Sequence, residues 1–177
     1  MRFTETSLSG AFMIEPELAE DERGFFARTY CSDVFEAHGL CSSIAQCSIS
    51  FNKHAGTLRG MHYQEPPRAE EKLVRCTVGA IYDVIIDLRP ESATYREWVS
   101  LEISSSNRLM LYAPKGFAHG FLTLEDNTEV FYQISEYYSP EHARGVRWND
   151  PVFGIRWPTE PRVISERDQS YPDYVEK

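Results

Sequence analysis

Two short segments of the chain carry most of the side chains that could take part in chemistry. The first contains Arg59 and His62 and is followed by Lys72, and the second, residues 114–120, contains His119. Imidazole groups serve as metal ligands or as hydrogen-bond partners in polar pockets, whereas a Lys ammonium brings positive charge. The first question is therefore whether these residues hold a metal ion or line a metal-free pocket.

The two segments resemble the two-part pattern of the cupin barrel, whose metal-binding members offer His-x-His and a Glu in the first part. Gln64 stands where the second His would be, and Lys72 stands near the expected position of the Glu. An amide is a poor ligand for a transition metal, and an ammonium group repels a divalent cation. A catalytic zinc or iron site usually needs three imidazole or carboxylate ligands, so we predict no metal.

The polar residues of the first segment are too dense for a strand in a hydrophobic core. Taken alone, His62 could be a hydrogen-bonded core residue and Lys72 could be solvated, as such side chains commonly are. Strand alternation, however, would place His62 and Gln64 together on one face and Arg59 on the other. A face of this kind can turn toward a barrel interior only if that interior is a wet pocket, which indicates a functional site.

Short apolar or alternating runs, closed by turn residues, make up most of the remaining chain. They are rich in Val, Ile, Phe, Tyr and Thr, the residues that strands favour. We predict strands near residues 10–14, 24–30, 43–51, 57–63, 73–78, 80–88, 98–103, 108–113, 118–124 and 129–135.

Only one internal segment is typical of a helix. Ser32 can cap this helix, Val34 and Phe35 supply its apolar side, and Gly39 can end it. Shorter helices are predicted near residues 141–144 and 165–168. So little helix among so many strands predicts an all-β fold, a cupin-type jelly roll or β-sandwich barrel, in one domain over residues 1–177.

Charge and composition exclude several classes of protein. The net charge of −9 and pI near 5.1 argue against a nucleic-acid or anionic-membrane partner. No apolar run approaches the roughly 20 residues that span a bilayer, and the N-terminus lacks the apolar region of a signal peptide. The four cysteines form no CxxC pair, which is typical of free thiols and predicts a cytoplasmic protein.

At the level of longer motifs, the chain closely resembles the dTDP-4-dehydrorhamnose 3,5-epimerase family, a cupin-fold group of nucleotide-sugar epimerases. The resemblance extends over nearly the whole length, and its motifs are specific in combination. They are residues 21–26, 58–64, 72–75, 83–89, 116–121, 137–138, 148–151 and 164–168.

The resemblance implies four catalytic residues. His62 would be the base that removes a proton beside the C4 ketone, and Asp168 would orient its imidazole. Lys72 would place positive charge beside the ketone oxygen as enolate character develops. Tyr132 would deliver a proton from the opposite face, which makes the exchange an inversion. Without the resemblance, Tyr132 fits a core aromatic and Asp168 fits a surface helix cap.

The same resemblance implies residues that bind the substrate. Arg59 and His119 match substrate-binding positions, Arg23 matches a diphosphate contact for which a planar guanidinium is well suited, and Tyr138 matches the aromatic that stacks on the nucleobase. The remaining predicted binding residues are Phe26, Arg28, Gln46 and Ser48. Family members exchange N-terminal strands, so a homodimer is expected, with Arg23 and Arg28 reaching the partner's pocket.

The chain departs from the family at positions that face the nucleotide. Arg28 stands where a Glu is usual, Gln46-Cys47-Ser48 replaces Gln-Asp-Asn, and Gln133 replaces a common Lys. Thymine and uracil present an N3–H donor that a Glu can accept, whereas cytosine presents an acceptor that prefers a donor such as Arg28. A CDP-linked sugar is therefore one hypothesis beside a dTDP or GDP sugar, and a further phosphate contact by Arg28 is the alternative.

The function that the resemblance implies is inversion of C3, C5 or both in a nucleotide-linked 4-keto-6-deoxy sugar through an enolate, with no cofactor. The sugar would serve deoxysugar and surface polysaccharide biosynthesis. Three alternatives stay open. They are a ketoisomerase on the same scaffold, a non-catalytic nucleotide-sugar binding protein, and a metal-dependent cupin oxygenase.

Overall fold

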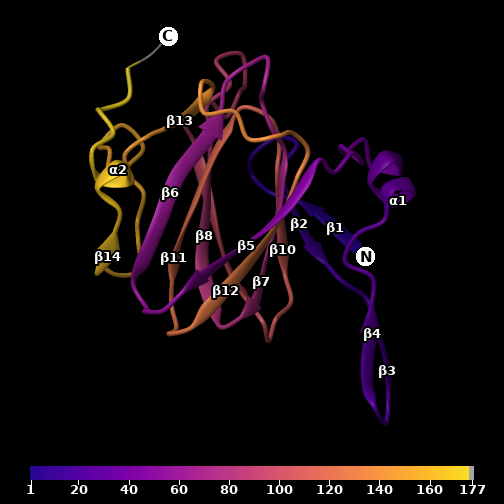
Figure 1. Ribbon diagram of the computed structural model, residues 1–177. Coiled ribbons are helices and arrows are strands. Elements are labelled where there is room, and N and C mark those ends of the chain that lie inside the picture. The colour runs from indigo at the N-terminus through magenta and orange to yellow at the C-terminus, as the bar shows by residue number, and fades with distance from the viewer. Residues whose placement is uncertain (176–177) are drawn as a thin grey trace.

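Two β-sheets pack against each other in the computed structural model, which describes residues 1–175 (Figure 1). In spatial order, the first sheet contains β1 (Arg2–Glu5), β2 (Phe12–Glu15), β10 (Met110–Ala113), β7 (Lys72–Val78), β12 (Thr128–Ile134) and β5 (Gln46–Asn52). The second contains β13 (Ala143–Gly145), β6 (Thr57–Gln64), β11 (Phe117–Thr123), β8 (Ala80–Asp87) and β9 (Trp98–Ser104). A short strand, β14 (Val163–Ile164), joins β6 in parallel.

The chain crosses repeatedly from one sheet to the other. Strands β5 and β7 lie in the first sheet, while β6 and β8 lie in the second. Apolar residues of both sheets then meet in one buried cluster, which includes Val74, Ile85, Leu111 and Phe121. Burial of these side chains is the main driving force for holding the sheets together. The predicted all-β fold is confirmed.

The helices agree with the prediction only in part. Helix α1 (Ser32–Ala37) is present, but its N-cap is Cys31 and no side chain caps it, so the predicted capping role of Ser32 is wrong. Helix α2 (Glu166–Gln169) is capped by Ser165, whose hydroxyl accepts a hydrogen bond from the Asp168 amide. Within residues 1–175 the structure has no helix long and apolar enough to cross a membrane.

Residues 141–144 do not form the predicted helix. They form a turn that leads into β13, in which Ala143 pairs with Gln64. The edge of β6 offers unpaired backbone groups at this point, and satisfying them outweighs a weak local helix preference.

The N-terminal region differs from the single strand predicted over residues 24–30. It forms a hairpin of β3 (Leu18–Asp21) and β4 (Gly24–Ala27), paired only with itself. Figure 1 shows this hairpin extending away from the two packed sheets. Its Phe26 side chain is 74% exposed, which is unusual for a large apolar residue in a folded chain.

A bulge in β6 sets the direction of the side chains along that strand. His62 pairs with His119 and Arg59 pairs with Phe121, so β6 has two residues between these pairs where β11 has only Gly120. The extra residue reverses the alternation of faces along β6. The strands also approach closely here, because a Cβ atom on Gly120 would lie 2.8 Å from the Gly60 Cα atom.

Candidate active site

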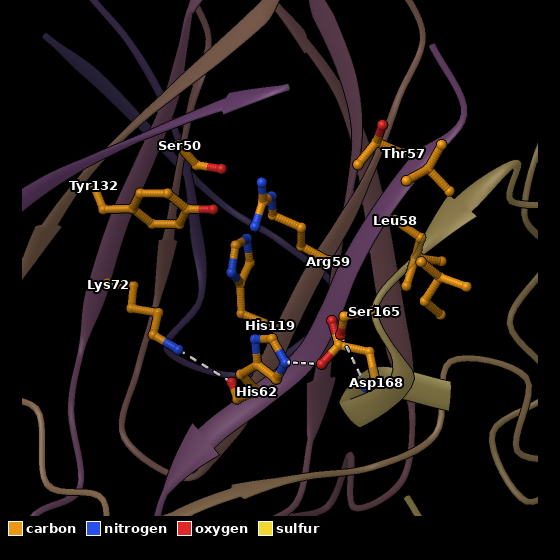
Figure 2. Close-up of a pocket in the computed structure, with 12 residues that line it drawn as sticks. Ser50, Thr57, Leu58, Arg59, His62, Lys72, His119, Tyr132, Ser165 and Asp168 are labelled. Atoms are coloured by element: carbon orange, nitrogen blue, oxygen red, sulfur yellow. Dashed lines mark hydrogen bonds and ion pairs between the residues drawn. The ribbon is translucent and has the colours of Figure 1, made fainter. Parts of the chain in front are cut away.

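A cavity of about 460 Å³ lies between the two sheets, beside α2. The first sheet contributes Ser50, Lys72 and Tyr132 to its lining, and the second contributes residues of β6 together with His119. Figure 2 shows Lys72 and Tyr132 on one side of the cavity and His62, backed by Asp168, on the other. The polar interior predicted from the density of charged residues is therefore present.

His62 and Asp168 form a close polar contact in the cavity wall. The Nε2 atom of His62 lies 2.7 Å from the Oδ1 atom of Asp168, across 106 positions of sequence. Because an ionised carboxylate only accepts, Nε2 donates and Nδ1 is left as an acceptor. The imidazole remains accessible, with 39% of its side chain exposed, whereas only 6% of the Asp168 side chain is exposed.

The C-terminal part of the chain carries Asp168 to this position. Parallel pairing of β14 with β6 places Ile164 beside Leu58, and Ser165 then starts α2. The Asp168 Oδ2 atom accepts a hydrogen bond of 3.3 Å from the Gly60 amide. The carboxylate is thus fixed by the strand that carries the imidazole and by the cap of its own helix.

The ionisation of Asp168 follows from these contacts. Burial on its own would raise the pKa of Asp168 by penalising the charged form. The hydrogen bond and charge of His62, together with hydrogen bonds from Gly60 and Ser165, outweigh burial and hold the pKa below its ordinary value. The carboxylate is therefore ionised at neutral pH.

A second imidazole–carboxylate pair has its imidazole in the cavity lining and its carboxylate behind it. The Nε2 atom of His119 is 2.7 Å from the Oδ1 atom of Asp83, and both side chains are buried. Among the described residues, the Asp83 Oδ2 atom has no hydrogen-bond partner. This carboxylate therefore brings an incompletely satisfied negative charge into the interior beside the cavity.

Tyr132 lies next to this second pair. Its ring is 5.9 Å from the His119 ring, centroid to centroid, in an edge-on arrangement. Burial raises the pKa of Tyr132, the charge of Asp83 raises it further, and Arg59 opposes the shift. The phenol consequently stays protonated at neutral pH and can act as a proton donor.

Lys72 enters the cavity from β7, opposite His62. Its Nζ atom donates to the His62 carbonyl oxygen at 3.1 Å and forms an ion pair of 2.8 Å with Glu70. Both partners of this ion pair have side chains that are only 10% exposed.

Arg59 also lines the cavity, so the predicted placement of Arg59 and His62 on opposite faces of the strand is wrong. The bulge in β6 explains the difference, because it brings both residues to the same side. The Arg59 Nε atom donates to the Asn52 side chain at 2.7 Å, which fixes the guanidinium at the cavity edge.

The structure brings together six of the predicted site residues, and they all line the cavity. These residues are Arg59, His62, Lys72, His119, Tyr132 and Asp168.

The other six predicted site residues lie outside the cavity lining. Three of them, Gln46, Ser48 and Tyr138, are connected to strands that form the site. Ser48 pairs with Tyr132 in the β5–β12 register, and Gln46 accepts a hydrogen bond from the Tyr138 amide. The remaining three, Arg23, Phe26 and Arg28, belong to the N-terminal hairpin or follow it directly.

Two carboxylates of the site were missed in the sequence. Asp83 could have been found, because a carboxylate within the apolar run of residues 80–88 must be buried and therefore needs a partner. Glu70 gives no such signal, because Glu70 and Glu71 before Lys72 have the pattern of a solvated charged turn.

The residue set does not fit a metal site. Across residues 1–175, His, Cys, Asp and Glu side chains nowhere gather in groups of three or more that could hold a metal ion. The cavity-facing bases are already paired with carboxylates, and an ammonium stands among them. Independence from metals and cofactors stays a prediction.

Comparison with known proteins gives consistent matches over almost the entire chain. The sequence profile of the family described as dTDP-4-dehydrorhamnose 3,5-epimerase matches residues 5–176. The dTDP-4-dehydrorhamnose 3,5-epimerase of Sinorhizobium fredii is 41% identical over 177 residues, covering 99% of this chain and 91% of that protein.

Solved structures agree with the sequence matches. The dTDP-4-dehydrorhamnose 3,5-epimerase of Bacillus anthracis, with TDP and PPi bound, has a TM-score of 0.93 and 44% identity, over 98% of this chain and 99% of that chain. ChmJ, a 3'-monoepimerase from Streptomyces bikiniensis in complex with dTDP-quinovose, has a TM-score of 0.87 and 32% identity, over 95% and 85% of the two chains. These similarities confirm the predicted cupin-type jelly roll.

The lowered pKa of Asp168 leads to a prediction about acid stability. A carboxylate whose pKa is lower in the folded state stabilises the fold above its ordinary value of 3.8, and this stabilisation is lost as the pH falls through the folded pKa. Asp168→Asn should therefore lower the free energy of unfolding by about 1–3 kcal/mol at neutral pH, and this deficit should shrink in acid. Urea denaturation between about pH 3 and pH 7 measures both.

Glu166→Gln is the matched control, since Glu166 is an exposed carboxylate in the same helix. It should change the unfolding free energy little at any pH. A deficit for Asp168→Asn that is constant across the pH range would contradict the prediction.

Proposed function

The chain belongs to the dTDP-4-dehydrorhamnose 3,5-epimerase family, and we propose that it inverts C3, C5 or both in a nucleotide-linked 4-keto-6-deoxy sugar. It is accordingly a carbohydrate epimerase of deoxysugar biosynthesis. The reaction removes a proton beside the C4 ketone, passes through an enolate, and returns a proton to the opposite face of the same carbon. We place surface polysaccharide biosynthesis in the same proposal, as the destination of the sugar.

One observation carries this proposal. The cavity has the paired His62 on the side of one sheet, and Tyr132 and Lys72 on the side of the other. A hexose ring between these walls would have a proton acceptor on one face and a proton donor on the other. Inversion at carbon requires this arrangement, whereas a binding protein does not.

His62 is the base in this proposal. With Nε2 bonded to Asp168, Nδ1 is free to take the proton from the carbon next to the ketone. The ionised Asp168 stabilises the imidazolium that results. The proton then leaves to solvent, because His62 is accessible from the cavity.

Tyr132 is the acid and Lys72 stabilises the enolate. The phenol gives its proton to the enolate carbon from the side opposite His62 and is reprotonated from solvent, so that protons balance over one turnover. In this proposal the ammonium of Lys72 stabilises the negative charge that develops on the C4 oxygen. Loss of one preorganised donor of this kind costs about 3–4 kcal/mol in other enzymes.

Two variants should separate proton removal from inversion. In deuterium oxide, the wild-type protein should introduce solvent deuterium at C3 or C5 while the ketone stays at C4. His62→Asn should lower exchange and inversion together by about 100-fold or more. Tyr132→Phe should keep exchange catalysed by His62 but lose inversion, because the deuteron can return only on the original face.

Mass spectrometry and NMR of the products follow deuterium and configuration separately. Tyr95→Phe is the control, since its hydroxyl contacts Tyr174 outside the cavity, and this variant should behave as wild type. Movement of the ketone would favour a ketoisomerase. Ligand binding without any exchange in the wild-type protein would favour a non-catalytic binding protein.

We also propose a homodimer in which each N-terminal hairpin completes the cavity of the partner chain. The hairpin extends from the sheets, and the Arg23 side chain is 85% exposed with Asp21 as its ion-pair partner. Arg23, Phe26 and Arg28 do not line the cavity of their own chain. The edge strand β5 also exposes Ile49 and Phe51, which suits coverage by a second chain.

Mixed dimers test this exchange. Arg23→Ala and His62→Asn should each lose most activity alone. In a mixed dimer, the intact His62 of one chain meets the intact Arg23 of the other, so one cavity of the two is complete. Coexpression of the two chains should restore about a quarter of wild-type activity, since half of the dimers are mixed and half of their sites work.

If Arg23 served its own chain, the mixture would show no more than the sum of the two variants. Size-exclusion chromatography with light scattering on the same samples reports whether dimers form at all.

For the nucleotide, we propose CDP rather than dTDP. This proposal is supported by Arg28, which follows the hairpin with an exposed side chain and stands where the family usually has a Glu. A guanidinium donates to the N3 acceptor of cytosine, whereas the N3–H group of thymine would face another donor.

Calorimetric titration with CDP, dTDP and GDP tests the choice of base. CDP should bind most tightly to the wild-type protein, and Arg28→Glu should shift the preference toward dTDP by about tenfold, or 1.4 kcal/mol. Tightest binding of dTDP to the wild-type protein would refute the proposal. If Arg28→Glu weakened the binding of all three nucleotides equally, Arg28 would instead be identified as a phosphate contact.

Two further expectations belong to the proposal. We propose that residues 1–177 form one domain, supported by a hydrophobic cluster that draws on both sheets. We also propose a cytoplasmic location, supported by the four cysteines, which are free in the structure.

A further inference from the structure

Lys72 has a carboxylate partner that lies outside the cavity lining. The Nζ atom is 2.8 Å from the Glu70 Oε1 atom, and each side chain is 10% exposed. Lys72 lines the cavity and Glu70 does not, so the carboxylate reaches the ammonium from behind. A contact this sheltered from solvent is screened less by water and salt than an exposed ion pair, and removal of one partner leaves an uncompensated charge.

The contact with Glu70 restricts the orientation of the Lys72 ammonium. A Lys ammonium has three N–H donors at fixed angles to one another. One donates to the His62 carbonyl oxygen at 3.1 Å and a second to Glu70. When two of the N–H groups are held in this way, the third can point in only one direction. This third N–H group is the one that could donate to an oxygen atom in the cavity.

We infer that Glu70 is a positioning residue, which directs the free N–H group of Lys72 at the C4 oxygen of the substrate. This inference rests on the proposed function, because it gives Glu70 its role through the enolate that Lys72 stabilises. Without Glu70, the four-carbon stem of Lys72 regains rotamer freedom and the ammonium takes up several orientations. The enolate then meets a correctly placed donor for only part of the time.

The neighbouring Glu71 provides a matched comparison. It precedes Lys72 directly, but it contacts Lys115 and Ser135 and does not line the cavity. The two carboxylates therefore have the same charge and almost the same place in the sequence, and only Glu70 touches the ammonium.

Substitutions at Glu70 should act on turnover and not on binding. Glu70→Ala removes the acceptor and should lower kcat by about 10- to 100-fold, with KM changed less than about threefold, because the donor acts on the enolate. Glu70→Gln retains an oxygen acceptor and should keep at least about a third of the wild-type kcat. Glu71→Ala should retain wild-type kinetics.

A double-mutant cycle separates positioning from a general effect on the fold. In the background of Lys72→Ala, Glu70→Ala should cause no further loss of kcat, because the group that it directs is gone. If Glu70→Ala does not fold, Glu70→Leu fills a similar volume without an acceptor and takes its place in the cycle.

The outcomes are distinct. An unchanged kcat in Glu70→Ala, an equal loss in the Lys72→Ala background, or a Gln variant as impaired as the Ala variant each overturns the inference while leaving the proposed function intact. A wild-type protein that exchanges no deuterium into any 4-keto sugar nucleotide overturns the proposed function, and this inference falls with it.

Discussion

The contact between His62 and Asp168 is the constraint on which the rest of the site depends. It joins strand β6 to a four-residue helix across the sheet edge, and its carboxylate is buried. A buried charge without a partner would be strongly destabilising, so the C-terminal segment must lie against β6 for the imidazole and the carboxylate to coexist. Strand β14, the cap at Ser165 and the Gly60 amide all serve this placement.

The same logic is repeated around the cavity. Three basic side chains of the cavity have a carboxylate partner, with Asp168 behind His62, Asp83 behind His119 and Glu70 behind Lys72. The carboxylates balance the charge of the site and restrict the orientation of the bases, while the cavity itself presents donors and cations. Such a pocket is preorganised for a substrate that becomes more negative during the reaction.

Much of this arrangement was predictable from the sequence, and the failures have physical causes. His62, Lys72 and His119 stand out because polar residues are rare on strands that also carry core side chains. Asp168 and Tyr132 could be assigned only by resemblance, since a capping Asp and an apolar-strand Tyr are ordinary structural residues. Arg59 was placed on the wrong face because a bulge depends on pairing between strands, which local alternation does not record. The hairpin of β3 and β4 pairs with neither sheet, so strand pairing within the sheets does not fix its position.

The separation of His62 from Asp168 along the chain has a consequence for biosynthesis. While the polypeptide is being synthesised, strand β6 can form its pairs with β11 long before residue 168 leaves the ribosome. Until then the imidazole has no carboxylate, and the cavity lacks the wall that β14 and α2 provide. The nascent protein thus acquires its base and most of its sheets before it acquires the carboxylate that orients the base, and a chain terminated before Asp168 would lack that carboxylate.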